Sequence, residues 1–224
     1  MKELRPTGTL NVARVPLPRR PLVRNLNDAY TYGVALLPFS RKGAWQRSNR
    51  QNFERSLADQ DAFDHGRLFA IGHLWLAKLS LDGKVTDYGL VSCRVVTDTG
   101  VAYIVDAFQN LVELENMKFH ALGTGTTAEA ATQTALVTEL TTQYSTSSTR
   151  PTGSLGEKSG DSKTYETVAT ITVSASVAAT EHAIMSQAAT GGGVMLDRSL
   201  FSVINLASGE SLLSTYDLTF PSNG

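Results

Sequence analysis

The chain is poor in cysteine, in charge and in long apolar runs. Its 224 residues include one cysteine, Cys93, which excludes a disulfide framework and a multi-cysteine zinc site. Charged residues make up 18%, below the usual quarter, and no apolar run approaches the roughly 18 residues of a membrane helix. The first residues lack the apolar core of a signal peptide, so none is expected. The hydrophobic share of 42% excludes a wholly disordered chain and allows a buried core.

The charges are distributed unevenly along the chain. Residues 1–60 hold eleven Lys and Arg against four Asp and Glu, a balance of +7. Residues 61–224 hold nine against seventeen, a balance of −8, and the two parts sum to the net charge of −1. Such a split indicates that the two ends of the chain contact different surfaces, or that the basic start of the chain contacts the acidic body of a neighbouring molecule.

Residues 1–27 are predicted to form an extended basic arm. Three prolines lie within residues 14–22, and each fixes its own φ and disfavours helix in the residue before it. No acid lies between Glu3 and Asp28. Singly spaced Val and Leu favour an arm that orders on a partner over a solvated tail. At about 3.1 to 3.3 Å per residue, the arm could reach several tens of ångströms. Its arginines are Arg5, Arg14, Arg19, Arg20 and Arg24.

A second basic segment, residues 40–53, carries aromatic side chains. It places Trp45 near Arg41, Arg47 and Arg50. Basic and aromatic residues together are typical of nucleic-acid binding, and equally of an exposed loop anchored at a protein interface. We predict that these four residues and the arm arginines bind a partner protein; nucleic acid is not the expected partner.

Strand signals dominate from residue 67 onward. Asp82-Gly83 separates two apolar-rich runs, 69–81 and 85–96, which predicts a β-hairpin. A turn is predicted at 97–100. The run 101–108 fits either a buried strand or a short helix, and 109–116 has a helical pattern.

The C-terminal part predicts an antiparallel sandwich or barrel. Apolar residues alternate over 165–177, which indicates one long strand with one face in the core. Further strands are expected at 181–187, 194–206 and 211–220, separated by glycine-rich turns. The Ala-rich stretch 127–142 suits a short helix or a crossing loop, and the Ser/Thr-rich stretch 141–164 suits an exposed loop or the tip of a long hairpin. The predicted organisation is a 1–27 arm, a β-rich region over 28–117 and a sandwich over 118–224, with little helix.

The chain shows no motif that carries chemistry. No pair among His65, His73, His120 and His182 has the i,i+2 or i,i+4 spacing of a local metal site, so each is expected to be an ordinary surface or half-buried histidine. Cys93 is expected to be a small buried hydrophobe.

The remaining signatures of chemistry are incomplete or scattered. The segment from Gly123 to Thr127 lacks the Lys-Ser/Thr of a phosphate-binding loop, which predicts a tight turn. The nucleophile elbow is missing. The carboxylates are dispersed, among them Glu129, Glu139 and Glu181. We therefore predict no catalytic residue, no metal and no cofactor.

The last half of the chain resembles a pattern found in virion proteins of tailed bacteriophages. The similarity begins with residues 121–139, which include Gly123-Thr124-Gly125. It continues through Thr180–Ile184, Gly191–Gly193 and Met195–Ser202, and ends with the strand at 212–220. The resemblance implies a structural part of a phage particle that is assembled in the host cytoplasm.

Four functional hypotheses follow. The first is a capsid cement or decoration protein, a dimer or trimer that clamps neighbouring major capsid proteins through its arm. The second is a tail, neck or head-fibre component that contacts the host surface. The third is an enzyme acting on glycans, which is less favoured because no residue is poised for chemistry. The fourth is a nucleic-acid binder that uses the first 60 residues, which is less favoured because the rest of the chain is negatively charged.

Overall fold

The computed structural model describes residues 61, 70–94 and 96–220, all within the compact unit Phe39–Gly224. These residues are mainly β. Residue 61 is helical, and the two helices that are described along their whole length are the α-helix α4 (Asp98–Phe108) and the short 3₁₀ helix η2 (Leu114–Asn116). The strands are β1 (Ile71–Leu79), β2 (Val85–Arg94), β3 (Phe119–Gly123), β4 (Gly156–Lys158), β5 (Asp161–Thr172), β6 (Val177–Met185), β7 (Met195–Leu206) and β8 (Ser211–Thr219). Among the described helices, none has the length and apolar character needed to cross a membrane.

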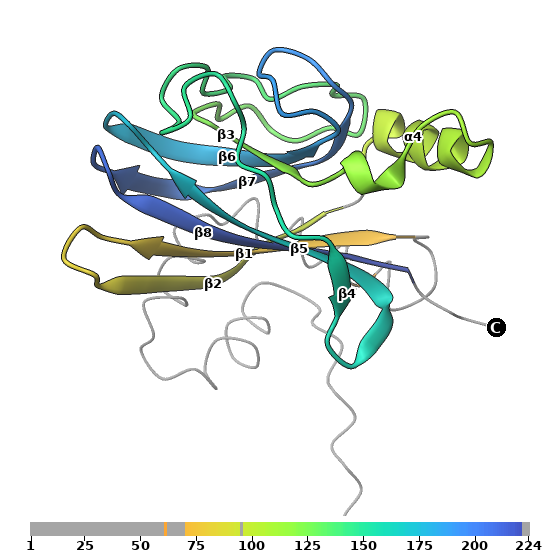
Figure 1. Ribbon diagram of the computed structural model, residues 1–224, viewed down its shortest axis with the longest axis horizontal. Helices are drawn as coiled ribbons and strands as arrows, with labels where there is room; N and C mark the ends of the chain where they lie inside the picture. The colour runs from red at the N-terminus through yellow and green to blue at the C-terminus, as the bar shows by residue number, and fades with distance from the viewer. Residues whose placement is uncertain (1–60, 62–69, 95, 221–224) are drawn as a thin grey trace, which may run out of the picture. The chain divides into compact units, whose positions relative to one another are not determined.

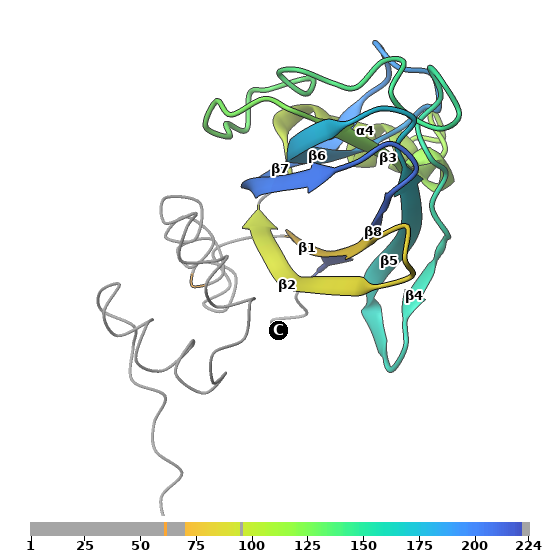
Figure 2. The same cartoon turned by 90° about the vertical axis from the view of Figure 1, so that its left-hand side faces the viewer.

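The strands form two antiparallel sheets, one of order β2-β1-β8-β5-β4 and one of order β3-β6-β7. Figures 1 and 2 show the two sheets facing each other. The predicted antiparallel β-sandwich body is thereby confirmed. Strands β1 and β2, from the predicted 28–117 region, lie in the same sheet as β5 and β8, from the predicted C-terminal sandwich. The five-stranded sheet is therefore built from both regions.

The predicted hairpin around Asp82-Gly83 is present. β1 pairs with β2, and Gly83 has a φ of 79°, a left-handed conformation that glycine adopts without steric cost. The amide of Gly83 donates to the carbonyl of Ser80 and closes the turn. On its other edge, β1 pairs with β8 along its whole length, so the hairpin is held in the sheet.

The main core lies between the two sheets. It takes apolar side chains from β1, β5 and β8 on one side and from β3, β6 and β7 on the other. Leu74, Ile171 and Leu212 are fully buried on the larger sheet, and Leu122 and Ile184 on the smaller one. Burial of an aliphatic side chain of this size stabilises the fold by about 1.5 to 3 kcal/mol.

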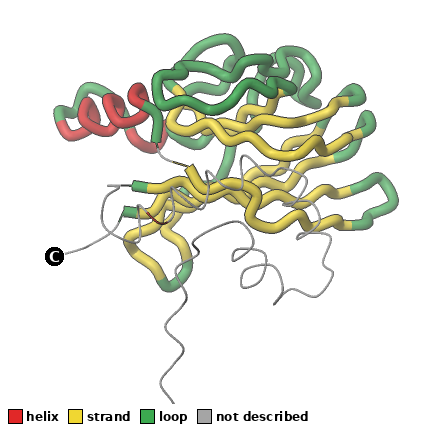
Figure 3. The backbone as a smooth tube through the Cα atoms, turned by 180° about the vertical axis from the view of Figure 1, so that it is seen from behind, coloured by secondary structure: helices red, strands yellow, loops and turns green. Residues whose placement is uncertain are grey.

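The three-stranded sheet is buried on both faces. Its outer face carries a second apolar cluster, with Ala121, Ala183, Met185 and Met195 packed against Leu136. The connections between β3 and β4 lie over this face (Figures 1 and 3). This double burial explains why β7 begins with seven consecutive buried residues instead of an alternating pattern.

The prediction of one long strand over residues 165–177 is wrong. The alternation holds, because Thr167, Ala169, Ile171 and Val173 are buried, but β5 ends at Thr172 and β6 begins at Val177. The chain turns through small exposed residues at 174–176. Small residues at a two-residue period suit a strand and a tight strand-to-strand connection equally well, so the period did not locate the turn.

The undecided run 101–108 is helical. The predicted turn at 97–100 is instead the start of α4, where the Thr97 hydroxyl accepts a hydrogen bond from the amide of Gly100 at 3.0 Å. This is the usual N-terminal cap of a helix. The helical pattern read over 109–116 is wrong for most of its length, because the chain turns at Asn110 (φ 58°) and only η2 follows.

The two stretches predicted after β3 have different outcomes. Residues 127–142 form a loop, one of the two predicted alternatives. The prediction of an exposed loop over 141–164 is wrong for Tyr144 and Arg150, which are fully buried within it. The last part of this stretch forms the β4–β5 hairpin, in agreement with the predicted alternative of a hairpin tip.

Candidate functional site: an apolar groove beside helix α4

An apolar groove of about 810 Å³ opens at the side of the body where α4 and the β4–β5 hairpin lie (Figure 1). We call it the α4 groove. One wall comes from α4, η2 and the residue after η2, and the other from the β4–β5 hairpin, β7 and the end of β8. Its apolar lining residues are Ile104, Phe108, Leu114, Met117, Leu155, Tyr165, Leu196, Leu218 and Phe220. A volume of this size can accept a small ligand or a few side chains of a partner.

Hydrogen bonds to the backbone hold both walls in place. The Tyr103 hydroxyl donates to the carbonyl of Glu113 at 2.9 Å, and the Tyr165 hydroxyl donates to the carbonyl of Met117 at 2.8 Å. Burial raises the pKa of Tyr165 to about 12, so its hydroxyl keeps its proton at neutral pH. The amide of Phe220 donates to the carbonyl of Lys163. The groove is therefore formed before any partner arrives.

An exposed apolar stripe continues from the groove along the outer side of α4. Val101, Val105 and Phe108 are spaced i, i+4 and i+7 and share one helix face, and Phe108 is 85% exposed. Beyond the helix, Leu111 (67% exposed) and Leu114 extend the stripe. Contiguous apolar surface on a folded body typically marks a binding site for another molecule.

The sequence contains a signal for this stripe that the prediction for residues 101–108 did not use. The opposite face of α4 buries Gly100 and Tyr103, so the helix has apolar residues on both faces. An amphipathic surface helix normally has one apolar face. Once 101–108 is known to be a helix, the second apolar stripe is visible from spacing alone.

The wall formed by α4 and η2 is acidic. Residues 97–117 contain Asp98, Asp106, Glu113 and Glu115 and no Lys or Arg. Glu115 and Glu157 line the groove, and among the described residues Lys163 is the one lysine that does so. The combination of an apolar floor and an acidic wall fits a ligand with aliphatic side chains and positive charge.

The histidines expected at the surface include two that are fully buried. His120 on β3 and His182 on β6 lie with Nδ1 and Nε2 3.1 Å apart. His120 Nδ1 lies 3.0 Å from Ser214 Oγ on β8, and its Nε2 lies 3.1 Å from Thr167 Oγ1 on β5. The expectation is wrong for these two, because distant strands bring them together; His73 is half-buried as expected.

This cluster links the two sheets through neutral groups. Burial lowers the pKa of His120 to about 3. Burial, with a smaller contribution from His120, lowers the pKa of His182 well below its ordinary value. Neutral imidazoles can each donate and accept one hydrogen bond, which satisfies the polar atoms of the cluster. The arrangement therefore stabilises the sandwich, and it offers no ionised group for chemistry.

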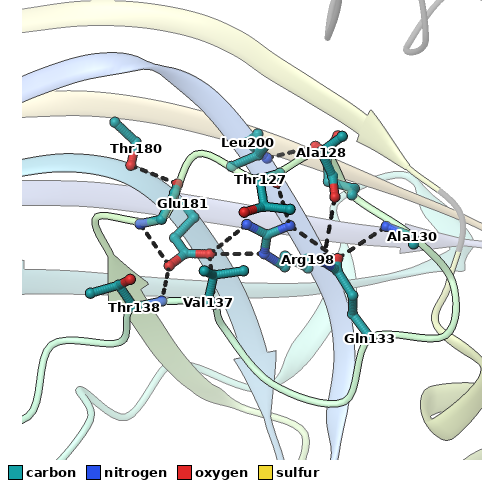
Figure 4. A network of polar contacts seen from close by, with 12 residues as sticks. Thr127, Ala128, Ala130, Gln133, Val137, Thr138, Thr180, Glu181, Arg198 and Leu200 are labelled. Atoms are coloured by element: carbon teal, nitrogen blue, oxygen red, sulfur yellow. Dashed lines mark hydrogen bonds and ion pairs between the residues drawn. The ribbon is translucent and has the colours of Figure 1, made fainter.

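A buried carboxylate, Glu181 on β6, organises the loop over the outer face of the small sheet (Figure 4). Its Oε1 accepts hydrogen bonds from the amides of Gly125 and Thr138, and its Oε2 accepts one from the amide of Val137. The Arg198 Nε donates to Oε2 at 2.8 Å. Both side chains are almost fully buried. The pair therefore fixes the 124–138 part of the loop against the sheet.

The prediction of a tight turn from Gly123 to Thr127 is wrong, because Gly123 ends β3 and the residues after it form no turn. The glycines instead allow a close approach of the backbone to Glu181. A Cβ added at Gly125 would lie 2.5 Å from Glu181 Oε1, and one at Gly123 would lie 2.6 Å from the carbonyl oxygen of Thr138. These glycines let the loop reach the carboxylate. The amide of Gly125 thus points at Glu181, a protein anion, in the way that a phosphate-binding loop points at phosphate.

The other internal carboxylates noted in the sequence also pair with arginines. Arg94 Nε donates to Glu129 Oε1 at 2.9 Å. Arg150 contacts Glu139 through two nitrogens, the bidentate geometry that guanidinium groups favour. These pairs anchor loops to the sheets. Within the described residues, no group of three or more His, Cys, Asp and Glu is placed to hold a metal ion. Cys93 is buried, as predicted.

The predicted partner-binding residues lie outside the described residues. They are Arg5, Arg14, Arg19, Arg20, Arg24, Arg41, Trp45, Arg47 and Arg50, and their role stays a prediction. The α4 groove is a separate candidate that the structure adds. In comparisons with protein families, curated proteins and solved structures, nothing matches this chain.

Proposed function

We propose that this protein is a structural component of a tailed-phage virion, a capsid cement or decoration protein. In this proposal the basic arm of residues 1–27 clamps neighbouring major capsid proteins, and the β-sandwich forms a rigid body beside them. A dimer or trimer would attach at several points at once, which raises its avidity without further contacts.

The exposed apolar surface of the α4 groove is the observation that carries the proposal. A preformed groove with a highly exposed Phe108 at its edge suits a protein whose work is to bind other proteins. The opposite charges of the first 60 residues and the rest of the chain suit assembly from many copies. The resemblance of the last half of the chain to phage virion proteins is the reason for proposing a phage particle.

The organisation of the buried charges supports the same function. Glu129, Glu139 and Glu181 each pair with an arginine and hold a loop on a sheet. Loops that are fixed in this way resist local opening, because each opening would break a buried ion pair. A body that must hold a lattice together benefits from such resistance.

Two measurements test the proposal with the full-length chain. The first is a reconstruction of the purified phage particle by electron microscopy, with the chain labelled by an antibody. Density on the head shell, between capsid proteins, is the expected result. Label on the tail or on fibres would overturn the cement assignment in favour of a host-contacting component, and no label on the particle would overturn the virion assignment.

The second measurement is rebinding to particles that have been stripped of the protein. A variant in which Arg14, Arg19, Arg20 and Arg24 are all changed to Gln should bind between about fourfold and a thousandfold more weakly, since exposed ion pairs contribute about 0.2 to 1 kcal/mol each. Lys84→Gln removes one exposed cation from the β1–β2 turn and is the control. Equal binding by the arginine variant and the control would show that the arm does not clamp the capsid.

A further inference from the structure

The α4 groove has an acidic wall and an apolar floor, and the same chain carries a segment of matching chemistry. We infer that the groove receives residues 14–24 of a second copy, so that copies are joined to one another by exchanged arms. This goes beyond the proposed function, because the contact forms between copies of this chain and does not depend on which particle carries them.

Charge complementarity is the first argument. The 14–24 segment contains Arg14, Arg19, Arg20 and Arg24 and no acid. Residues 97–117, which include α4 and η2, contain four acids and no base; of these acids Glu115 lines the groove, together with Glu157 and Lys163. Opposite charges on two surfaces steer them together and fix their register. No other stretch of the chain combines this positive charge with so many prolines.

The apolar side chains match in the same way. Between its arginines the segment carries Val15, Leu17 and Leu22, interspersed with three prolines. Proline-rich segments favour the extended polyproline conformation, which lays side chains into aromatic-lined grooves at a low entropic cost. The α4 groove supplies aromatic side chains from Phe108, Tyr165 and Phe220.

The length of chain before the body permits exchange. Ile71 at the start of β1 pairs with Thr219, one residue before Phe220 of the groove. The preceding 70 residues therefore connect to the body beside the groove. An extended 14–24 segment would cover about 34 Å at 3.1 Å per residue, and residues 1–13 remain for direct contact with the capsid surface. The arm then clamps neighbouring capsid proteins in part by linking the copies that bind them, so the arginines of residues 14–24 contribute to rebinding as well as to the link between copies.

Disulfide cross-linking between two differently tagged full-length chains tests the inference. One chain carries Ala13→Cys, just before the docking segment, and the other carries Leu111→Cys. Leu111 is 67% exposed and does not line the groove, and the native Cys93 is buried, so it should contribute little to the background cross-linking. The matched control replaces Leu111→Cys by Val203→Cys, at an apolar residue of β7 that is also exposed and lies outside the groove lining.

Docking should make the Ala13→Cys and Leu111→Cys chains cross-link at least about tenfold faster than the control pair, because it raises the local concentration of one thiol around the other. A synthetic peptide of residues 12–25 should compete, and Glu115→Lys should slow the reaction. Equal rates for both pairs would overturn the inference. So would a disulfide that forms within a doubly substituted single chain but not between chains. Because no particle is used, these outcomes are independent of the test of the proposed function.

Discussion

The buried pair of Glu181 and Arg198 gives the sharpest test of how the body is held together. The change Glu181→Gln keeps the volume and shape of the side chain and removes its charge. The exposed fractions of the two side chains are 0% for Glu181 and 1% for Arg198. Water therefore cannot solvate the positive charge of Arg198 once the carboxylate is removed. We therefore expect a large loss of stability from a substitution that creates no cavity.

The magnitude follows from the contacts. Removing one partner of a buried ion pair costs about 3 to 5 kcal/mol, because the other charge stays buried without compensation. Three backbone amides, at Gly125, Val137 and Thr138, also exchange a charged acceptor for a neutral amide group. For a chain of this length, 3 to 5 kcal/mol corresponds to a fall in Tm of roughly 6 to 20 °C.

Urea unfolding followed by circular dichroism measures the effect. Glu157→Gln, on the exposed strand β4, is the matched control and should change the unfolding free energy by less than about 0.5 kcal/mol. Adding Arg198→Met to Glu181→Gln should recover part of the loss, because the uncompensated charge is then gone. A loss below about 1 kcal/mol in the single variant, or no recovery in the double variant, would refute the reasoning.

Three further predictions concern pH and packing. Burial raises the pKa of Asp197 to about 7, so the stability that its protonated form contributes is present below about pH 4 and is lost as the pH rises through 7. In urea unfolding at a series of pH values, the unfolding free energy of Asp197→Asn should therefore increase relative to that of the wild type between pH 4 and pH 7. A difference that does not change with pH would contradict this. Burial lowers the pKa values of His120 and His182, so the stability that these two neutral histidines contribute is present above about pH 6.5 and is lost as the pH falls. His182→Gln should reduce the slope of the unfolding free energy against pH below pH 6 by about 1.4 kcal/mol per pH unit. An unchanged slope would show that His182 is not buried in its neutral form. Gly125→Ala should lower the unfolding free energy by about 1 to 3 kcal/mol, because the new Cβ would overpack against Glu181. The control is Gly156→Ala, where nothing lies within 4 Å of the added atom. Equal unfolding free energies for the two variants would contradict the prediction.

Local chemistry was sufficient for part of the fold. Asp82-Gly83 between two apolar runs specified a hairpin because the turn demands a left-handed residue and glycine supplies it. The alternation from Thr167 to Val173 specified a half-buried strand, since a period of two places every second side chain on one face. The β class and the antiparallel arrangement followed from such signals, which act over a few residues.

The site required more than local chemistry. Whether residues 101–108 became a strand or a helix depended on Thr97, which caps the helix and also donates to the carbonyl of Met195, 98 positions along the chain. The helix in turn places Phe108 opposite the β4–β5 hairpin, whose bounds within the polar stretch 141–164 the sequence does not indicate. The groove exists because these two distant segments meet.

The sequence alone determined the class of the fold, the hairpin and the opposite charges of the arm and the body, because these depend on residue type and short-range spacing. Tertiary structure decided that β6 and β7 are covered on both faces, that His120 meets His182, and that Glu181 lies beneath a glycine loop. The reason is physical: burial and ion pairing between segments tens of residues apart depend on how the sheets stack, and no short window of sequence records that stacking.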